Sequence, residues 1–458
     1  MITDNNSHKR DELFSSEQWE VLKNSISNRT VAKLCEENPQ LLIFPHCIND
    51  THENFRKGKI CSIVGDEMTT ENIVGFIGVT DRDSGESVEL TIRSRFQAEK
   101  DKEDYFLHYM LQKVFKVSIL DLQHSGSNED LFDFAIYLFP HYLKRAMRQG
   151  LYRQYCQREY NDANVRGAID VSRHIRTNIP FNGRIAYRTR EYQHDNPLMQ
   201  LIRHTIEYIR NHKYSGNILK CDKDMSDYVR TVYDITPSYK AADLQRVITQ
   251  NLKPVTHPFY TEYMVLQKLC LHILRCKGIK YGQSSEKIYG ILFDCAWLWE
   301  EYLATIMPDD KFTHAVRELK NGYKFYDGES DHQRYPDFYS EVHRIVADAK
   351  YKHIDKGGIQ RNDLFQLIAY LHTLCDNGAK YGALIYPLDQ TDGKVWEKPK
   401  KLGGYGGYID TIGIPIPKNT NNYQEFFTQM ERNRLVLSSY PSDTTEQIEI
   451  LTTKTTAI

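Results

Sequence analysis

The chain has 458 residues, of which 40% are hydrophobic and 26% charged, and its formal net charge is −2. This composition predicts a globular protein of roughly two to three domains and excludes a disordered chain or one drawn to nucleic acid by its overall charge. Nine cysteines without any C-x-x-C disfavour a disulfide framework or a zinc site, and no apolar stretch is long enough to span a membrane, so we expect a cytoplasmic protein.

Residues 1–110 are expected to form a mixed α/β domain. The pattern of residues 1–55 is polar and mostly helical, whereas residues 60–96 are rich in strand-forming side chains. Two runs, Ile73–Val79 and Val88–Ile92, flank a polar turn and predict a β-hairpin. This hairpin is expected either to support its own domain or to dock on a partner.

Residues 111–280 are expected to form a mainly helical middle region. A long helical pattern runs from Leu131 to Gln149. Asn196 and Pro197 then provide an N-cap and a first-turn proline for the next helix, and helical patterns continue to about residue 278.

A basic stretch lies within this middle region. Between Lys144 and Arg190 there are eleven lysines and arginines against three acidic residues, with several tyrosines among them. Guanidinium groups bind phosphates and aromatic rings pack on sugars or bases, so the stretch is a candidate DNA-binding surface. A solvated helix face has a similar composition and is the alternative. The residues assigned to DNA binding are Arg166, Arg173, Arg176, Arg184 and Arg188.

Residues 281–435 contain the most informative pattern of the chain. Residues 344–351 are apolar in the middle and polar at the end, as in an inner strand whose tip opens into a cleft. Strand side chains alternate, so Asp348 and Lys350 share one face. A short run before it, joined by a turn at residues 340–343, would bring Asp337 beside Asp348.

Two carboxylates at one sheet edge repel each other unless a cation lies between them. Hard oxygen ligands with open positions suit Mg²⁺, which keeps water and takes a substrate phosphate. Lys350 would orient the attacking water or neutralise the transition state. The order Asp337, Asp348, Lys350 is that of nucleases of the PD-(D/E)xK kind and predicts an enzyme that cleaves nucleic acid.

A helix is expected after the loop at Lys356–Gly358, with Asn362 as its cap and leucines at helical spacing. Gln366 and Tyr370 are four residues apart and therefore lie on one face of this helix. We expect them to hold a phosphate or the nucleophilic water.

Upstream, residues 288–306 are predicted to form one long apolar helix that carries Glu300 and Glu301. Glu300 is expected to supply a further carboxylate to the metal; the alternative is that the acidic pair is only the solvated side of the helix. Asp-x-Lys also begins at Asp309 and at Asp392, but without a strand before it or a helix after it. A surface ion pair on a sheet edge is the alternative to the nuclease interpretation.

The order of the segments FDCAWLWEEYLA, YPDFYSE, RIVADAKYK, DLFQLIAYLH and YGALIYP resembles the McrC family of McrBC-type modification-dependent restriction systems. The likeness extends upstream and covers roughly residues 130–415. It implies a C-terminal endonuclease domain and an N-terminal part that docks on McrB, a hexameric AAA+ GTPase that recognises modified DNA. The resemblance carries over Asp337, Asp348 and Lys350 as catalytic, with Gln366 as support and Glu300 as a further carboxylate. The residues assigned as catalytic are Asp337, Asp348, Lys350, Gln366, Glu300 and Tyr370, and the metal ligands are Asp337, Asp348, Ala349 and Glu300.

The resemblance implies Mg²⁺-dependent cleavage of double-stranded DNA, coupled to GTP hydrolysis that the chain stimulates in its partner. The chain lacks G-x-x-x-x-G-K-S/T, so GTP is expected to bind the partner and not this chain. The alternatives are a non-catalytic DNA-binding adaptor or activator of the GTPase, and a stand-alone nuclease for repair or mobile-element processing.

The expected fold class is α/β in a multidomain α+β arrangement. It comprises a strand-containing N-terminal domain, a helical middle region, a restriction-endonuclease-like domain with a mixed sheet flanked by helices, and a tail at residues 436–458.

Overall fold

The structure is a computed structural model, and the chain divides into two compact units. Unit 1 comprises Met1–Gln123 and Lys287–Ile458, and unit 2, His124–Glu286, is an insertion in it. The structure describes residues 2–10, 13–38, 41–45, 57–81, 85–97, 104–115, 129–211, 216–220, 222–279, 288–307, 312–314, 323–324, 333–354, 359–374, 381–389, 396–404 and 406–438.

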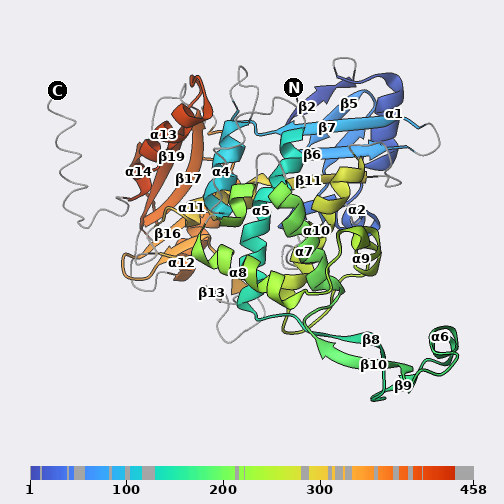
Figure 1. The fold of residues 1–458 in the computed structure, drawn as a ribbon. Coiled ribbons are helices and arrows are strands. Elements are labelled where there is room, and N and C mark those ends of the chain that lie inside the picture. Colours follow the sequence, from blue (N-terminus) through green and yellow to red (C-terminus); the bar gives the residue numbers. More distant parts are fainter. Residues whose placement is uncertain are drawn as a thin grey trace. The chain divides into compact units, whose positions relative to one another are not determined.

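The N-terminal part of unit 1 is built on a five-stranded mixed sheet (Figure 1). Its strands, in spatial order, are β1 (Ile2–Thr3), β7 (Ser87–Arg93), β6 (Ile73–Thr80), β11 (Ile288–Asp294) and β3 (Leu41–Phe44). The predicted β6–β7 hairpin is confirmed. β11 comes from far along the chain and pairs antiparallel with β6 and parallel with β3, so it completes this sheet.

Further elements surround this sheet. A three-stranded sheet consists of β2 (Ser7–Lys9), β5 (Glu67–Thr70) and β4 (Cys61–Val64), and the helices are α1 (Ser16–Ser25) and α2 (Val31–Glu37). Ser15 and Gln18 form a capping box at the start of α1, whose Trp19 and Leu22 are buried in the core. The region predicted as mostly helical therefore also contains strands.

A six-stranded mixed sheet forms the C-terminal part of unit 1. Its spatial order is β12 (Thr313–His314), β15 (Phe338–Ser340), β16 (Ile345–Ala349), β17 (Tyr381–Asp389), β19 (Tyr408–Ile416) and β18 (Trp396–Lys401), and a separate pair is formed by β13 (Tyr323–Lys324) and β14 (Gln333–Arg334). β16, β17 and β19 run parallel. The helices are α4 (Tyr105–Phe115), α11 (Cys295–Ala304), α12 (Arg361–Leu374), α13 (Tyr423–Asn433) and α14 (Leu435–Ser438).

Several contacts join the sheets of unit 1, among them two hydrogen bonds. The hydroxyls of Ser94, just after β7, and Tyr351, just after β16, are hydrogen-bonded at 2.7 Å. α11 follows directly on β11, where the Asp294 side chain accepts hydrogen bonds from the first-turn amides, and Trp299 of α11 donates to the Ile385 carbonyl of β17 at 3.3 Å. The two sheets of unit 1 are therefore connected directly by hydrogen bonds and by α11.

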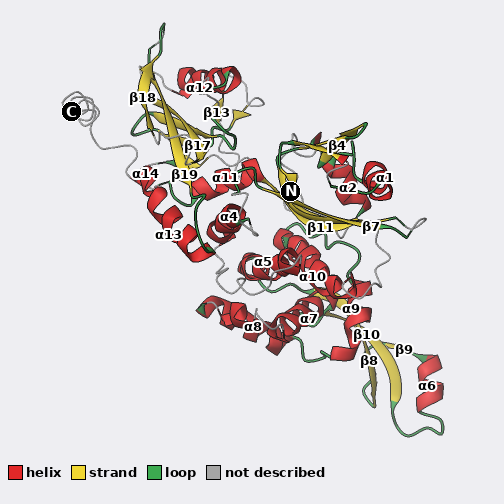
Figure 2. Ribbon diagram, turned by 90° about the horizontal axis from the view of Figure 1, so that it is seen from above, coloured by secondary structure: helices red, strands yellow, loops and turns green. Residues whose placement is uncertain are grey.

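Unit 2 consists of a helical group and a long hairpin (Figure 2). The helices are α5 (Glu129–Arg148), α7 (Pro197–Asn211), η3 (Gly216–Lys220), α8 (Lys223–Ile235), η4 (Ala241–Asp243), α9 (Leu244–Gln250) and α10 (Thr261–Ile279). The hairpin pairs β8 (Gln154–Asp162) with β10 (Ile185–Gln193) and carries β9 (Ala168–Ile169) and α6 (Val171–Thr177) at its far end. We call residues 154–193 the arm.

The predicted fold class is confirmed, with two corrections. Residues 288–306 do not form one helix, because Ile288–Asp294 is a strand buried on both faces, for which the sequence shows only an apolar run. Asn362 lies in the first turn of α12 and is not its cap. The arm was not predicted. The cap at Asn196 is confirmed.

Two other expectations fall on residues that the structure does not describe. The loop at Lys356–Gly358 lies outside the described residues, as does the tail from residue 439 onward. Among the helices that the structure describes, none combines the length and apolarity needed to cross a bilayer.

The pairing of β6 with β11 can be tested by a substitution at Gly290, where the two strands approach closely. Gly290 has φ +153°, and a Cβ placed there would lie 2.2 Å from the Phe76 carbonyl oxygen. We expect Gly290→Ala to lower the free energy of unfolding by about 2 kcal/mol or more, because the added methyl forces the strands apart. Gly403→Ala, where no atom lies within 4 Å of the added Cβ, is the control. Equal denaturant midpoints for the two variants would contradict the pairing.

Candidate active site

The β15–β16 hairpin brings the two predicted aspartates together. Phe338 pairs with Ala347, so Asp337, one residue before β15, lies opposite Asp348. Asp337 Oδ2 accepts a hydrogen bond from the Ala349 amide at 2.6 Å, and the Asp348 carboxylate lies close enough to raise the pKa of Asp337. The predicted convergence of the two side chains is therefore present.

Burial and like charge dominate the electrostatics of this pair. Asp348 is 1% exposed, and burial raises its pKa although the Lys350 ammonium opposes the shift. Burial also raises the pKa of Asp337 well above its usual range, and the Glu300 and Asp348 carboxylates raise it further. Such a set of oxygens favours either protons or a cation.

Lys350 connects the aspartates to α12. Its ammonium forms an ion pair with Asp348 and donates to Gln366 Oε1 at 3.0 Å. Gln366 Nε2 in turn donates to the Tyr370 hydroxyl at 3.3 Å. Burial lowers the pKa of Lys350, but Asp348 and Asp337 outweigh it and the net pKa is raised, so the side chain is a cation. Polar contacts therefore link the side chains of Asp348, Lys350, Gln366 and Tyr370 in that order.

Glu300 also faces this group. The side chain keeps 29% of its surface exposed, yet burial, followed by the carboxylates of Glu301 and Asp348, raises its pKa to about 8. Glu300 in turn raises the pKa of Asp337. Glu300 therefore interacts electrostatically with both aspartates.

The donor set fits a hard divalent cation with few protein ligands. Within the described ranges, no three side chains of His, Cys, Asp or Glu form a ready-made metal cage. Mg²⁺ needs only one or two carboxylates, because water and substrate phosphate complete its shell. Ala349, predicted as a ligand, contributes its amide to Asp337. Its role at a metal stays a prediction.

His314 is a further residue at this site that sequence reasoning missed. Its Nδ1 lies 2.7 Å from the Asp337 main-chain oxygen, and its ring stacks on Phe338. Nε2 faces the Glu300 and Glu301 carboxylates at 3.8 and 4.0 Å. β12 has only two residues, so no periodic pattern marks His314 in the sequence.

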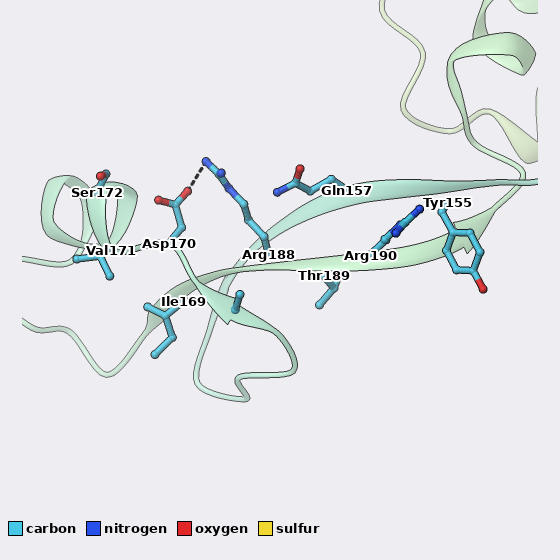
Figure 3. Close-up of a pocket in the computed structure, with 10 residues that line it drawn as sticks. Tyr155, Gln157, Ile169, Asp170, Val171, Ser172, Arg188, Thr189 and Arg190 are labelled. Carbon is cyan, nitrogen blue, oxygen red and sulfur yellow. Dashed lines mark ion pairs between the residues drawn. The ribbon is translucent and has the colours of Figure 1, made fainter.

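The five arginines assigned to DNA binding all lie on the arm, but ion pairs already engage two of them. Arg188 pairs with Asp170 at 2.6 Å (Figure 3) and with Glu159. Arg173 pairs with the same two carboxylates.

The other three arginines differ from these. Arg166 lies over the Tyr160 ring. Arg176 and Arg184 are exposed, and no ion pair in the described part of the chain engages them. Six exposed apolar side chains lie at the same end of the arm: Val165, Ile169, Val171, Ile175, Ile179 and Phe181.

The placement of Glu300 beside the two aspartates can be tested in the metal-free protein through the pH dependence of its stability. The unfolded state ionises near pH 4.5 and the folded state near pH 8, so stability falls as pH rises between these values. We expect Glu300→Gln to melt above the wild type at pH 8, with a smaller difference at pH 5, in the presence of a chelator. Melting temperatures that differ equally at both pH values would contradict the placement of Glu300.

Comparison with known proteins identifies the family. The family model of the McrBC 5-methylcytosine restriction system component matches residues 68–387. No curated protein matches the chain. One similar solved structure is a refined half-complex, from a tetradecameric assembly, of Thermococcus gammatolerans McrB AAA+ hexamers with bound McrC; the identity is 14%, the match covers 94% of this chain and 99% of that chain, and the TM-score is 0.47. Another is the cryo-EM structure of the McrBC complex of the same organism; the identity is 15%, the match covers 67% of this chain and 85% of that chain, and the TM-score is 0.30.

Both likenesses are too remote to carry a structural argument. The family match, in contrast, spans well over half of the 458 residues and includes the β15–β16 hairpin and α12. The chain therefore belongs to the family of McrBC 5-methylcytosine restriction system components.

Proposed function

We propose that this chain is the endonuclease subunit of a GTP-dependent McrBC-type restriction complex, and that it hydrolyses phosphodiesters of modified double-stranded DNA with Mg²⁺. The observation that carries the proposal is the convergence of Asp337, Asp348 and Lys350, with Gln366 behind the lysine. A buried group of carboxylates with one lysine is costly in a structural role, because each charge loses its hydration.

Each residue has a distinct task in this proposal. Asp337 and Asp348 would hold the metal, with Glu300 and the Ala349 main chain as further ligands. The cation, when bound, neutralises charge that develops on the phosphodiester and favours ionisation of the attacking water. Lys350 binds a phosphate oxygen or the water as a permanent cation.

Two side chains of α12 support this lysine. Gln366 accepts from the Lys350 ammonium, and Tyr370 accepts from Gln366. The lysine is thereby kept at the edge of the sheet where the aspartates lie, as a preorganised catalytic cation requires.

We assign GTP to a partner, an AAA+ GTPase of the McrB kind, because this sequence contains no phosphate-binding glycine loop of the P-loop type. The similar complex from Thermococcus gammatolerans contains McrB AAA+ hexamers with bound McrC. The chain would bind such a hexamer and stimulate its GTP hydrolysis. Residues 1–110 and the arm are the two candidate docking regions.

The catalytic assignment is tested by substitution at the centre. We expect Asp348→Asn and Lys350→Ala each to reduce cleavage of methylated plasmid about 100-fold or more, because one removes the negative charge of a proposed metal ligand and the other the catalytic cation. Folding, measured by thermal melting, and stimulation of the partner GTPase should persist. The measurement is plasmid cleavage with GTP and Mg²⁺, with and without the GTPase.

Lys418→Ala is the matched control, because Lys418 pairs with Asp389 at 2.8 Å elsewhere in unit 1. Full cleavage by either active-site variant would remove the catalytic claim. A wild-type chain that stimulates GTP hydrolysis but never cleaves DNA would favour the adaptor. Cleavage that needs no GTPase would favour the stand-alone nuclease.

The DNA-binding assignment is tested on the arm. We expect Arg176→Ala combined with Arg184→Ala to weaken DNA binding and to reduce the slope of log affinity against log salt by about 2, since two phosphate contacts are lost. The matched control is Arg188→Ala, because Asp170 and Glu159 already neutralise Arg188. Unchanged DNA binding with impaired GTPase stimulation would assign this end of the arm to the partner protein.

A further inference from the structure

Asp337 lies on a weakly anchored part of the six-stranded sheet. It precedes β15, which has three residues, and the neighbouring edge strand β12 has two. The side chain of Asp337 is fixed by the Ala349 amide. Asp337 itself lies one residue outside the three-residue pairing of β15 with β16, so a second attachment of its main chain would restrict the carboxylate further.

The second attachment comes from His314. A carbonyl oxygen only accepts hydrogen bonds, so Nδ1 of His314 must carry the proton in its 2.7 Å contact with the Asp337 main-chain oxygen. The imidazole is stacked on Phe338, with ring centroids 5.1 Å apart and planes 25° from parallel. His314 of β12 pairs with Phe338 of β15, and this pairing fixes the position of the imidazole along the strand.

We infer that His314 is a positioning residue of the proposed nuclease centre, which fixes the Asp337 carboxylate for metal binding by holding its main-chain carbonyl. This inference rests on the proposed function. Asp337 is then held at two points, the side chain by β16 and the main chain by β12. Partners that orient metal ligands in this way strengthen metal binding although they do not touch the metal.

Two substitutions separate this role from simple packing. His314→Phe keeps a flat ring that can stack on Phe338 but has no donor for the Asp337 carbonyl. His314→Asn keeps a donor at the position of Nδ1 but has no ring. A packing role is preserved by phenylalanine, whereas a positioning role through the hydrogen bond is preserved by asparagine.

The experiment is calorimetric titration of the full-length chain with Mn²⁺, as a probe for Mg²⁺, together with thermal melting of each variant. We expect His314→Phe to weaken Mn²⁺ binding on the order of 10-fold or more. His314→Asn should bind close to the wild type. Asp348→Asn, which removes the negative charge of a proposed ligand, should weaken binding at least as much as His314→Phe and so show that the titration reports on this site.

The titration distinguishes failure of the positioning role of His314 from failure of the proposed metal centre. Wild-type affinity in His314→Phe, or equal weakening in both folded variants, overturns the positioning role while the metal centre stands. Binding that is absent in the wild type or unchanged in Asp348→Asn overturns the metal centre and the inference with it. If His314→Phe does not fold, His314→Asn decides alone: retained affinity supports the inference, and loss of affinity in a folded protein overturns it.

Discussion

Repulsion between carboxylates that the fold forces together is the constraint on which the rest of this structure depends. Burial raises the pKa of Asp337, Asp348 and Glu300, and neighbouring carboxylates raise the pKa of Asp337 and Glu300 further. In the absence of a cation, protons and the Lys350 ammonium offset the repulsion. A site of this kind exists only if the surrounding elements are stable enough to hold unfavourable neighbours in place.

Those elements come from distant parts of the chain. Asp294 caps α11 and thereby starts the helix that carries Glu300, and Trp299 fixes the same helix to β17. Beyond Lys350, Tyr351 is buried and hydrogen-bonded to Ser94 near the N-terminal sheet. The site is therefore supported on both sides by residues that take no part in the proposed chemistry, which is the usual way in which a catalytic group is kept in a fixed geometry.

The sequence predicts the local part of this arrangement. The alternation of a strand places Asp348 and Lys350 on one face, and the tight hairpin brings Asp337 opposite Asp348. Helical spacing likewise places Gln366 and Tyr370 together, as their hydrogen bond shows. These relations involve neighbours in sequence, so they follow from backbone periodicity alone.

Long-range relations are not predictable in this way. The apolar run Ile288–Phe293 fits a buried helix or a buried strand equally well, and its pairing with β3 and β6 decides between them. The arm has few apolar side chains to mark its strands, and the two tyrosines of each strand are five residues apart, so the sequence shows no period-two alternation there. His314 acts through one hydrogen bond to a main-chain carbonyl, for which no residue pattern exists.

The position of β11 has a consequence for biosynthesis. While the ribosome is still adding unit 2, the nascent chain already contains β3 and β6 but not the strand that joins them. The N-terminal sheet then exposes unpaired strand edges, which are prone to intermolecular pairing and are the kind of surface that chaperones bind. The sheet is completed only when Ile288–Asp294 has left the ribosome. The same stretch of chain therefore completes the N-terminal sheet of unit 1 and leads directly into α11.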